Sequence, residues 1–168
     1  KVKDINAFAC ADGSVRVFSS LMDIMSDDEL LGIIGHEIGH VKNSDTKDAM
    51  KSALKRSAIK NAAVSQSNTV NQLASSELGA LGESIINASY SRKQESEADE
   101  YSYNFMKKHS YNVLALASAF EKLAKLSEGG KGSSVDKLLA SHPDSEKRAK
   151  AVHERAKKAG PEKEKQAG

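Results

Sequence analysis

His36, Glu37 and His40 form an HExxH motif, which reads HEIGH at residues 36–40. On an α-helix, residues four positions apart share a face at about 6 Å spacing, so both imidazoles can reach one metal ion. A zinc ion held there lowers the pKa of a bound water to about 7, and the intervening glutamate can take the proton as the water attacks a carbonyl carbon. The motif predicts zinc-dependent hydrolysis, but it is short, and its surroundings must support it.

The residues before the motif predict the helix that the motif requires. The sequence Ser-Asp-Asp-Glu at 26–29 is a capping box, so the helix is expected to begin at Asp27. Five apolar residues form one stripe of this helix: Leu30, Leu31, Ile34, Ile38 and Val41. His36 and His40 lie on nearly the opposite face. The alternative interpretation is a core helix that carries two buried, hydrogen-bonded histidines.

Three glycines form another stripe of the same helix, at the edge of the histidine face. They are Gly32, Gly35 and Gly39. Each costs about 1 kcal/mol relative to alanine in a helix interior. Three such residues indicate that another backbone comes very close, as a second ligand-bearing helix would have to.

Two histidines do not complete a catalytic zinc site, which usually has three protein ligands and a water. Asn43 and Thr46 occupy the places where a metzincin would have a glycine and a third histidine, which excludes that class. A later segment, residues 91–100, offers Glu95 and Asp99 four positions apart on one face. One can bind zinc while the other accepts a hydrogen bond from a ligand imidazole, and the spacing does not decide between them. An acidic, solvated helix face is the structural alternative.

The motifs together resemble those of the HtpX and CAAX-prenyl-protease family of zinc metallopeptidases. They are NAFA at residues 6–9, HEIGH at 36–40, SRKQESEAD at 91–99, and SHP at 141–143 followed by Arg148. The resemblance runs from about residue 4 to about residue 156, and the motifs follow the family's order. It is greatest to a soluble branch of bacterial envelope lipoproteins, which implies a location in the bacterial cell envelope.

The resemblance also implies the roles of individual residues. The family pattern makes His36, His40 and Glu95 the ligands of one Zn²⁺ ion per chain and Glu37 the general base. Asp99 becomes the hydrogen-bond partner of a ligand histidine. Relatives often have a histidine where Asp45 stands; because that histidine is not a ligand, the difference is expected to leave the chemistry unchanged.

Further family positions concern the substrate, which the resemblance implies is a polypeptide. His142 and Arg148 are placed at the cleft, where His142 can donate a hydrogen bond to the oxygen that becomes negatively charged during hydrolysis. Because residues 129–134 form a glycine-rich loop, we expect His142 to lie some ångströms out of position without substrate. A strand implied by the resemblance pairs with an extended peptide and comprises Asn6, Ala7, Phe8 and Ala9.

Composition agrees with one globular domain. The chain has 168 residues, of which 39% are hydrophobic. Its net charge is only +2, and residues of both charges are distributed along the sequence, which argues against a nucleic-acid partner. We expect a catalytic domain at residues 1–159, an N-terminally truncated fragment, and a disordered tail at 160–168. The lone Cys10 cannot form an internal disulfide and is expected to be buried.

The predicted fold is α+β, mainly helical, with a small N-terminal sheet. Strands are expected at 2–10 and 14–19, around a turn at Ala11-Asp12-Gly13. After the HExxH helix, further helices are expected at about 45–66, 69–89, 91–109 and 112–128, and a last one to about 158 with Pro143 in its first turn. Residues 52–89 contain no run near the roughly 18 apolar residues of a membrane span.

The most economical interpretation is a zinc-dependent metalloendopeptidase. The alternative is a catalytically weak zinc-binding module with a chaperone-like or assembly role on the same fold. The intact Glu37 favours the enzyme, because a scaffold that only binds has no use for a general base.

Overall fold

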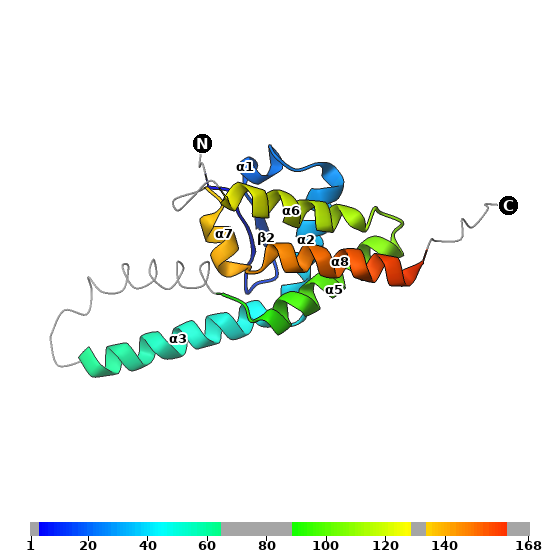
Figure 1. The fold of residues 1–168 in the computed structure, drawn as a ribbon. Helices are drawn as coiled ribbons and strands as arrows, with labels where there is room; N and C mark the ends of the chain where they lie inside the picture. Colours follow the sequence, from blue (N-terminus) through cyan, green and yellow to red (C-terminus); the bar gives the residue numbers. More distant parts are fainter. Residues whose placement is uncertain (1–3, 65–88, 129–133, 161–168) are drawn as a thin grey trace.

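The computed structural model describes residues 4–64, 89–128 and 134–160. These residues form a two-stranded antiparallel sheet followed by seven helices (Figure 1). In chain order the elements are β1 (Ala7–Ala9), β2 (Val15–Val17), α1 (Ser19–Met22), α2 (Asp27–Lys42), α3 (Asp45–Val64), α5 (Arg92–Lys108), α6 (Leu114–Ser127), α7 (Asp136–Ser141) and α8 (Ser145–Ala159). The predicted α+β class, mainly helical with a small N-terminal sheet, is confirmed.

The N-terminal hairpin has the predicted turn, although its strands are shorter than expected. Phe8 pairs with Arg16, and Asp12 closes the turn because its Oδ1 accepts a hydrogen bond from the Ser14 backbone N–H at 2.9 Å. Gly13 has a φ of 90°, a conformation that a residue without Cβ adopts at no steric cost. Cys10 is a free thiol that is half-buried, so the expectation of a buried side chain was wrong.

Helix α2 is the central element of the fold and contacts both strands, α3, α5 and α6. Its predicted capping box is confirmed, with the Ser26 N–H donating to Glu29 Oε2 at 2.8 Å. Glu29 also accepts hydrogen bonds from Ser118 Oγ and Lys122 Nζ of α6, each at 2.6 Å. Burial opposes ionisation of Glu29, but the bonds from Lys122, Ser118 and Ser26 outweigh it and lower the pKa to about 2. This carboxylate therefore joins the start of α2 to α6.

The glycine face of α2 is where the neighbouring helices come closest. A Cβ added at Gly39 would lie 2.8 Å from Ala98 Cα, and one at Gly35 would lie 2.8 Å from Ser102 Oγ, both on α5. A Cβ at Gly32 would lie 3.2 Å from Leu116 Cα of α6. The predicted close approach of another backbone is confirmed, and two helices make it. The apolar stripe of α2 is only half-buried, whereas the glycine and histidine faces are buried.

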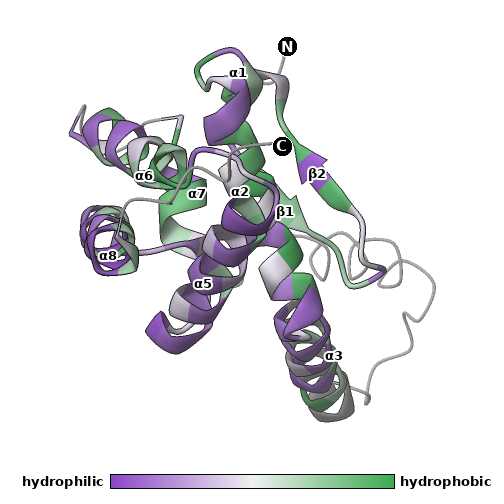
Figure 2. Cartoon of the chain, turned by 90° about the vertical axis from the view of Figure 1, so that its right-hand side faces the viewer, coloured by the Kyte–Doolittle hydropathy of each residue, from purple (hydrophilic) through white to green (hydrophobic). Residues whose placement is uncertain are grey.

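The helices differ in hydropathy according to their place in the fold. Figure 2 shows α5, α8 and α3 as largely hydrophilic, while α2, α6 and α7 carry more hydrophobic residues. The buried core draws above all on α6, through residues such as Leu116 and Phe120, and α8 adds Ala149 and Val152. Figure 1 shows α3 projecting from this body. No helix in the described ranges is both long and apolar enough to cross a membrane.

The C-terminal part differs from the sequence-based prediction in two respects. Helix α8 begins at Ser145, so the placement of Pro143 in its first turn was wrong. The cause lies at Asp144, whose left-handed backbone, with a φ of 64°, separates Pro143 from the helix. The short helix α7 before it was not anticipated. The helix predicted at 69–89 lies almost entirely outside the described residues, as does the predicted tail after residue 160.

The glycine contacts lead to a first prediction. Gly39→Ala should lower the free energy of unfolding, because overpacking typically costs about 1–3 kcal/mol and the nearest atom is backbone. Gly32→Ala is the matched control, since it gains the same helix propensity of about 1 kcal/mol and meets a wider gap. Urea denaturation should rank Gly39→Ala as the less stable of the two, and the opposite order would contradict the proposed tight contact.

Candidate metal centre

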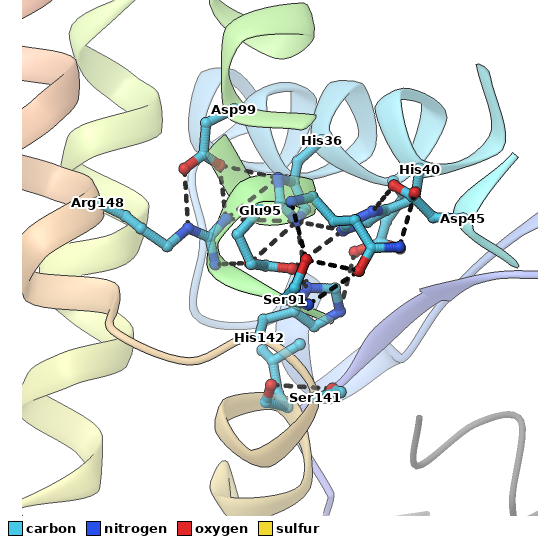
Figure 3. Close-up of polar contacts among 12 residues, drawn as sticks. His36, His40, Asp45, Ser91, Glu95, Asp99, Ser141, His142 and Arg148 are labelled. Carbon is cyan, nitrogen blue, oxygen red and sulfur yellow. Dashed lines mark hydrogen bonds and ion pairs between the residues drawn. The ribbon is translucent and has the colours of Figure 1, made fainter. Parts of the chain in front are cut away.

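Four buried side chains converge between α2, α5 and the end of α7 (Figure 3). Candidate ligand atoms of His36, His40, Glu95 and His142 all lie within 4.8 Å of one another. His36 and His40 come from successive turns of α2, Glu95 comes from the first turn of α5, and His142 is the C-cap of α7. The structure thus brings together residues that the sequence separates by up to 106 positions.

The spacing of the ligand atoms fits a tetrahedral metal ion. His36 Nε2 lies 3.0 Å from His40 Nε2, and Glu95 oxygens lie 3.2 Å from His40 Nε2 and 3.7 Å from His36 Nε2. Zinc bonds to nitrogen and oxygen of about 2.0–2.2 Å imply separations of about 3.3–3.6 Å between ligands. The separations between the three side chains predicted as ligands are therefore close to those in a tetrahedral zinc site.

Each histidine of α2 presents Nε2 to this centre because a carboxylate engages its Nδ1. Asp99 Oδ1 lies 2.9 Å from His36 Nδ1, and Asp45 Oδ2 lies 2.9 Å from His40 Nδ1. Carboxylates in this position fix the tautomer and orientation of a ligand imidazole. The sequence analysis had placed Asp99 in this position and had given Asp45 no role.

Arg148 of α8 holds the other side of the Asp99 carboxylate. Its Nε and Nη2 donate to Asp99 Oδ2 and Oδ1 at 2.9 and 2.6 Å, and its Nη1 contacts Glu95 Oε2. The guanidinium also lies 4.0 Å above the Phe120 ring. Burial opposes ionisation of Asp99, but the Arg148 charge and its hydrogen bonds outweigh it and lower the pKa of that carboxyl. Arg148 thereby docks α8 onto α5, the helix that carries Glu95 and Asp99.

The two histidines of α2 differ in their affinity for protons. Burial, and next the charge of Arg148, lowers the pKa of His36 and favours the neutral imidazole that metals bind. Burial also acts to lower the pKa of His40, but a hydrogen bond to Glu95 and the charge of Glu37 outweigh it, so the pKa is raised. Protons therefore compete with a metal ion more strongly at His40 than at His36.

The charges around the cluster favour a divalent cation. The buried carboxylates of Glu37, Asp45, Glu95 and Asp99 face a single buried guanidinium, that of Arg148, among the residues described. A cation reduces the excess of negative charge that burial would otherwise penalise. Within the described part of the chain, neither carboxylate oxygen of Glu37 has a hydrogen-bond partner, which is costly for a buried group unless water or substrate binds it. The donor set and charge balance fit a catalytic metal site.

Comparison with known proteins agrees with this geometry. The family model described as peptidase family M48 matches residues 1–156. This chain belongs to peptidase family M48. It is 45% identical over 153 residues to metalloprotease LoiP and 42% identical over 152 residues to metalloprotease YcaL, both of Escherichia coli (strain K12). These matches cover 91% and 90% of the chain, but the chain spans only 59% and 58% of the two relatives.

A more distant relative is the mitochondrial metalloendopeptidase OMA1 of Arabidopsis thaliana, 28% identical over 154 residues. That match covers 88% of this chain and 29% of the relative. The resemblance to the HtpX family and to the branch that includes LoiP is confirmed by these matches.

His142 lies closer to His36, Glu37 and Glu95 than was predicted from the sequence. Its Nδ1 is 3.1 Å from Glu95 Oε1 and 3.2 Å from His36 Nε2, and its Nε2 is 3.5 Å from Glu37 Oε1. The expectation of a displaced ring was therefore wrong. The cause is packing, because α7 is a regular helix whose Leu138 is buried, and the His142 N–H is bonded to Leu138 O at 2.8 Å.

Tyr90 covers one face of the His40 ring. The two rings are stacked with centroids 3.8 Å apart and planes at 13°. The Tyr90 N–H also donates to Ser141 O at 3.1 Å, beside His142. A tyrosine immediately before a capping box carries no sequence signal for this contact, which arises only when α5 and α7 pack against α2.

The proposed substrate strand, Asn6–Ala9, lies beside α2 and pairs with β2 along one edge. The ladder is continued by Phe18 N–H to Asn6 O at 3.0 Å, so the backbone groups of Ala7 and Ala9 face the other edge. Within the described ranges those groups have no hydrogen-bond partner, and the same edge is held at Ile5 by Ser134 O at 2.8 Å. Ala7 and Ala9 are nevertheless buried, whereas Phe8 and Cys10 are half-buried.

The contact between His36 and Asp99 generates the second prediction. Asp99→Ala should weaken zinc binding by about 10–100-fold, because the His36 ring loses the partner that orients it. Competition with a chromogenic chelator measures the affinity. Glu97→Gln, an exposed position on the same helix, serves as the control and should bind like the parent chain. An Asp99→Ala variant with the parent's affinity would remove Asp99 from the site.

Proposed function

We propose that this chain is the catalytic unit of a zinc metalloendopeptidase that hydrolyses peptide bonds of unfolded or misfolded proteins. One observation carries the proposal: a buried cluster of His36, His40 and Glu95 stands beside Glu37, whose carboxylate has no hydrogen-bond partner in the ranges that the structure describes. Membership of peptidase family M48 and the metalloprotease names of its relatives support the same conclusion. His36, His40 and Glu95 would hold one zinc ion per chain.

The chemistry divides between the ion and the protein. Bound zinc would act as a Lewis acid and bring the pKa of water to about 7. Glu37 takes one proton from the attacking water and passes it to the leaving amine nitrogen, so that the carboxylate is regenerated as the C–N bond breaks. Glu37 is buried, and among the described residues neither of its oxygens accepts a hydrogen bond that would have to be broken before this transfer.

His142 is proposed to stabilise the developing negative charge on the carbonyl oxygen. Its Nε2 lies 3.5 Å from Glu37 Oε1, so the ring borders the same space as the proposed general base. Its Nδ1 lies within reach of Glu95 and His36, so the same ring can instead occupy the fourth metal position. The two roles differ in their consequences, and a single variant separates them.

Substrate recognition is proposed to use the backbone of the N-terminal strand. An extended peptide would pair with the edge of residues 8–11, which makes recognition tolerant of side-chain sequence. The peptide would bond to the backbone groups of Ala7 and Ala9, because those of Phe8 and Cys10 already face β2. The location proposed for the chain is the bacterial cell envelope, on the strength of its likeness to the LoiP branch.

A binding or chaperone-like module is the alternative function. It would retain the metal ligands without any need for Glu37. A buried carboxylate that has no hydrogen-bond partner among the described residues is costly to the folded state, and that cost favours an enzyme.

The third prediction separates metal binding from catalysis. Glu37→Gln should retain zinc and lose peptidase activity, because the base is removed and the ligands remain. Glu95→Ala should lose zinc and activity together. Elemental analysis gives the metal content, and digestion of casein with and without a chelator gives the activity. Equal zinc content in Glu95→Ala and the parent chain would contradict the ligand assignment, and an active Glu37→Gln variant would contradict the base.

The fourth prediction concerns His142. Replacing it with alanine should lower turnover by about 10²–10³-fold, the usual cost of losing one donor to the transition state, with zinc content and KM nearly unchanged. Steady-state kinetics and elemental analysis measure these quantities. A variant with weaker zinc binding and higher turnover would show instead that His142 occupies the fourth metal position and blocks it.

A further inference from the structure

Asp45 is a buried acid that contacts both α2 and α5, the two helices that carry the proposed metal ligands. It is 6% exposed and lies at the first residue of α3. Its Oδ2 is 2.9 Å from His40 Nδ1, and its Oδ1 accepts a hydrogen bond from Gln94 Nε2 at 2.8 Å. Both carboxylate oxygens therefore make polar contacts. One contacts His40, a proposed ligand, and the other contacts α5, the helix that carries the proposed ligand Glu95.

The backbone between α2 and α3 is shaped to bring this acid back to His40. Ser44 has a φ of 66°, a left-handed conformation that costs a non-glycine residue energy. Ser44 follows the C-cap of α2, Asn43, and directly precedes α3, so its left-handed backbone turns the chain and Asp45 returns to a histidine five positions before it. A simple continuation of the helix would carry residue 45 away from the His40 face.

Gln94 extends the contact to the third ligand. It is the third residue of α5, and its Oε1 accepts a hydrogen bond from the Ser91 N–H at 2.9 Å in a capping box. Glu95 follows it directly in the sequence. The amide that caps α5 through its oxygen thus holds Asp45 through its nitrogen, and the first turn of α5 is tied to His40.

The surroundings of Asp45 differ from those of Asp99. Asp99 shares its charge with Arg148 through two hydrogen bonds, whereas Asp45 meets the uncharged amide of Gln94. Among the described residues, His40 is the only group in an ion-pairing position with Asp45. Its negative charge is therefore directed at His40, which raises the basicity of that ligand.

We propose that Asp45 and Gln94 are a second pair of positioning residues for the metal, which orient His40 and fix the first turn of α5 that carries Glu95. This proposal rests on the proposed metal site. It also gives a role to a position where the family resemblance indicated only a neutral difference.

Zinc affinity measured on purified protein by chelator competition tests the pair. Asp45→Ala should bind zinc about 10–100-fold more weakly than the parent chain, the range expected when a ligand histidine loses its carboxylate. Asp45→Asn keeps an oxygen acceptor without the charge and should fall between the two. Gln94→Leu should give a smaller loss than Asp45→Ala. The absorption spectrum of the cobalt-substituted protein should change in Asp45→Ala, since His40 is no longer held in one orientation.

Asp48→Ala is the matched control, because Asp48 is an exposed acid in the same first turn of α3. It should leave zinc affinity and the cobalt spectrum unchanged. If Asp45→Ala binds zinc like the parent and only its melting temperature falls, Asp45 merely stabilises the start of α3 and the proposal is overturned. If the parent chain binds no zinc, or Glu95→Ala binds it equally well, the proposed function fails and this inference falls with it.

Discussion

The close approach of α5 to α2 is the constraint on which the rest of the site depends. Gly35 and Gly39 leave no room for a Cβ against Ser102 and Ala98, so the two backbones meet on the face next to the histidines. At this distance a glutamate side chain from the first turn of α5 reaches the His40 Nε2 atom at 3.2 Å. The helix propensity lost at each glycine, about 1 kcal/mol, is thus linked directly to the ligand geometry.

The negative charge of the buried carboxylates is the second constraint on the site. Four buried carboxylates would repel one another, and each is restrained differently: Asp99 by Arg148, Asp45 by Gln94 and His40, Glu95 by the histidines, and Glu37 by no hydrogen bond. Asp99 and Asp45, which are held by hydrogen bonds, can orient the histidines, whereas Glu37 is not held in this way and can react. The buried Arg148 serves two of the carboxylates at once, which explains why α8 must pack beside α5.

Much of this site could be predicted from the sequence because its signals are local. The HExxH spacing, the capping box at Ser26 and the four-residue interval from Glu95 to Asp99 each lie within a turn or two of helix. Asp45 could not be assigned because its role depends on the left-handed backbone at Ser44. The position of His142 depends likewise on α7, whose packing has no periodic signature over six residues. Contacts between distant segments carry no comparable signal.

The order of the site residues along the chain has a consequence for biosynthesis. His36 and His40 are made early, Glu95 follows, and His142 and Arg148 come last, with contacts that span 47 to 112 positions. During translation the helix that bears the histidines therefore emerges long before its partners. Until Arg148 has left the ribosome, a nascent chain cannot form the contacts of this residue with Asp99 and Glu95, so the candidate metal centre gains its buried guanidinium only after all its other residues have been made.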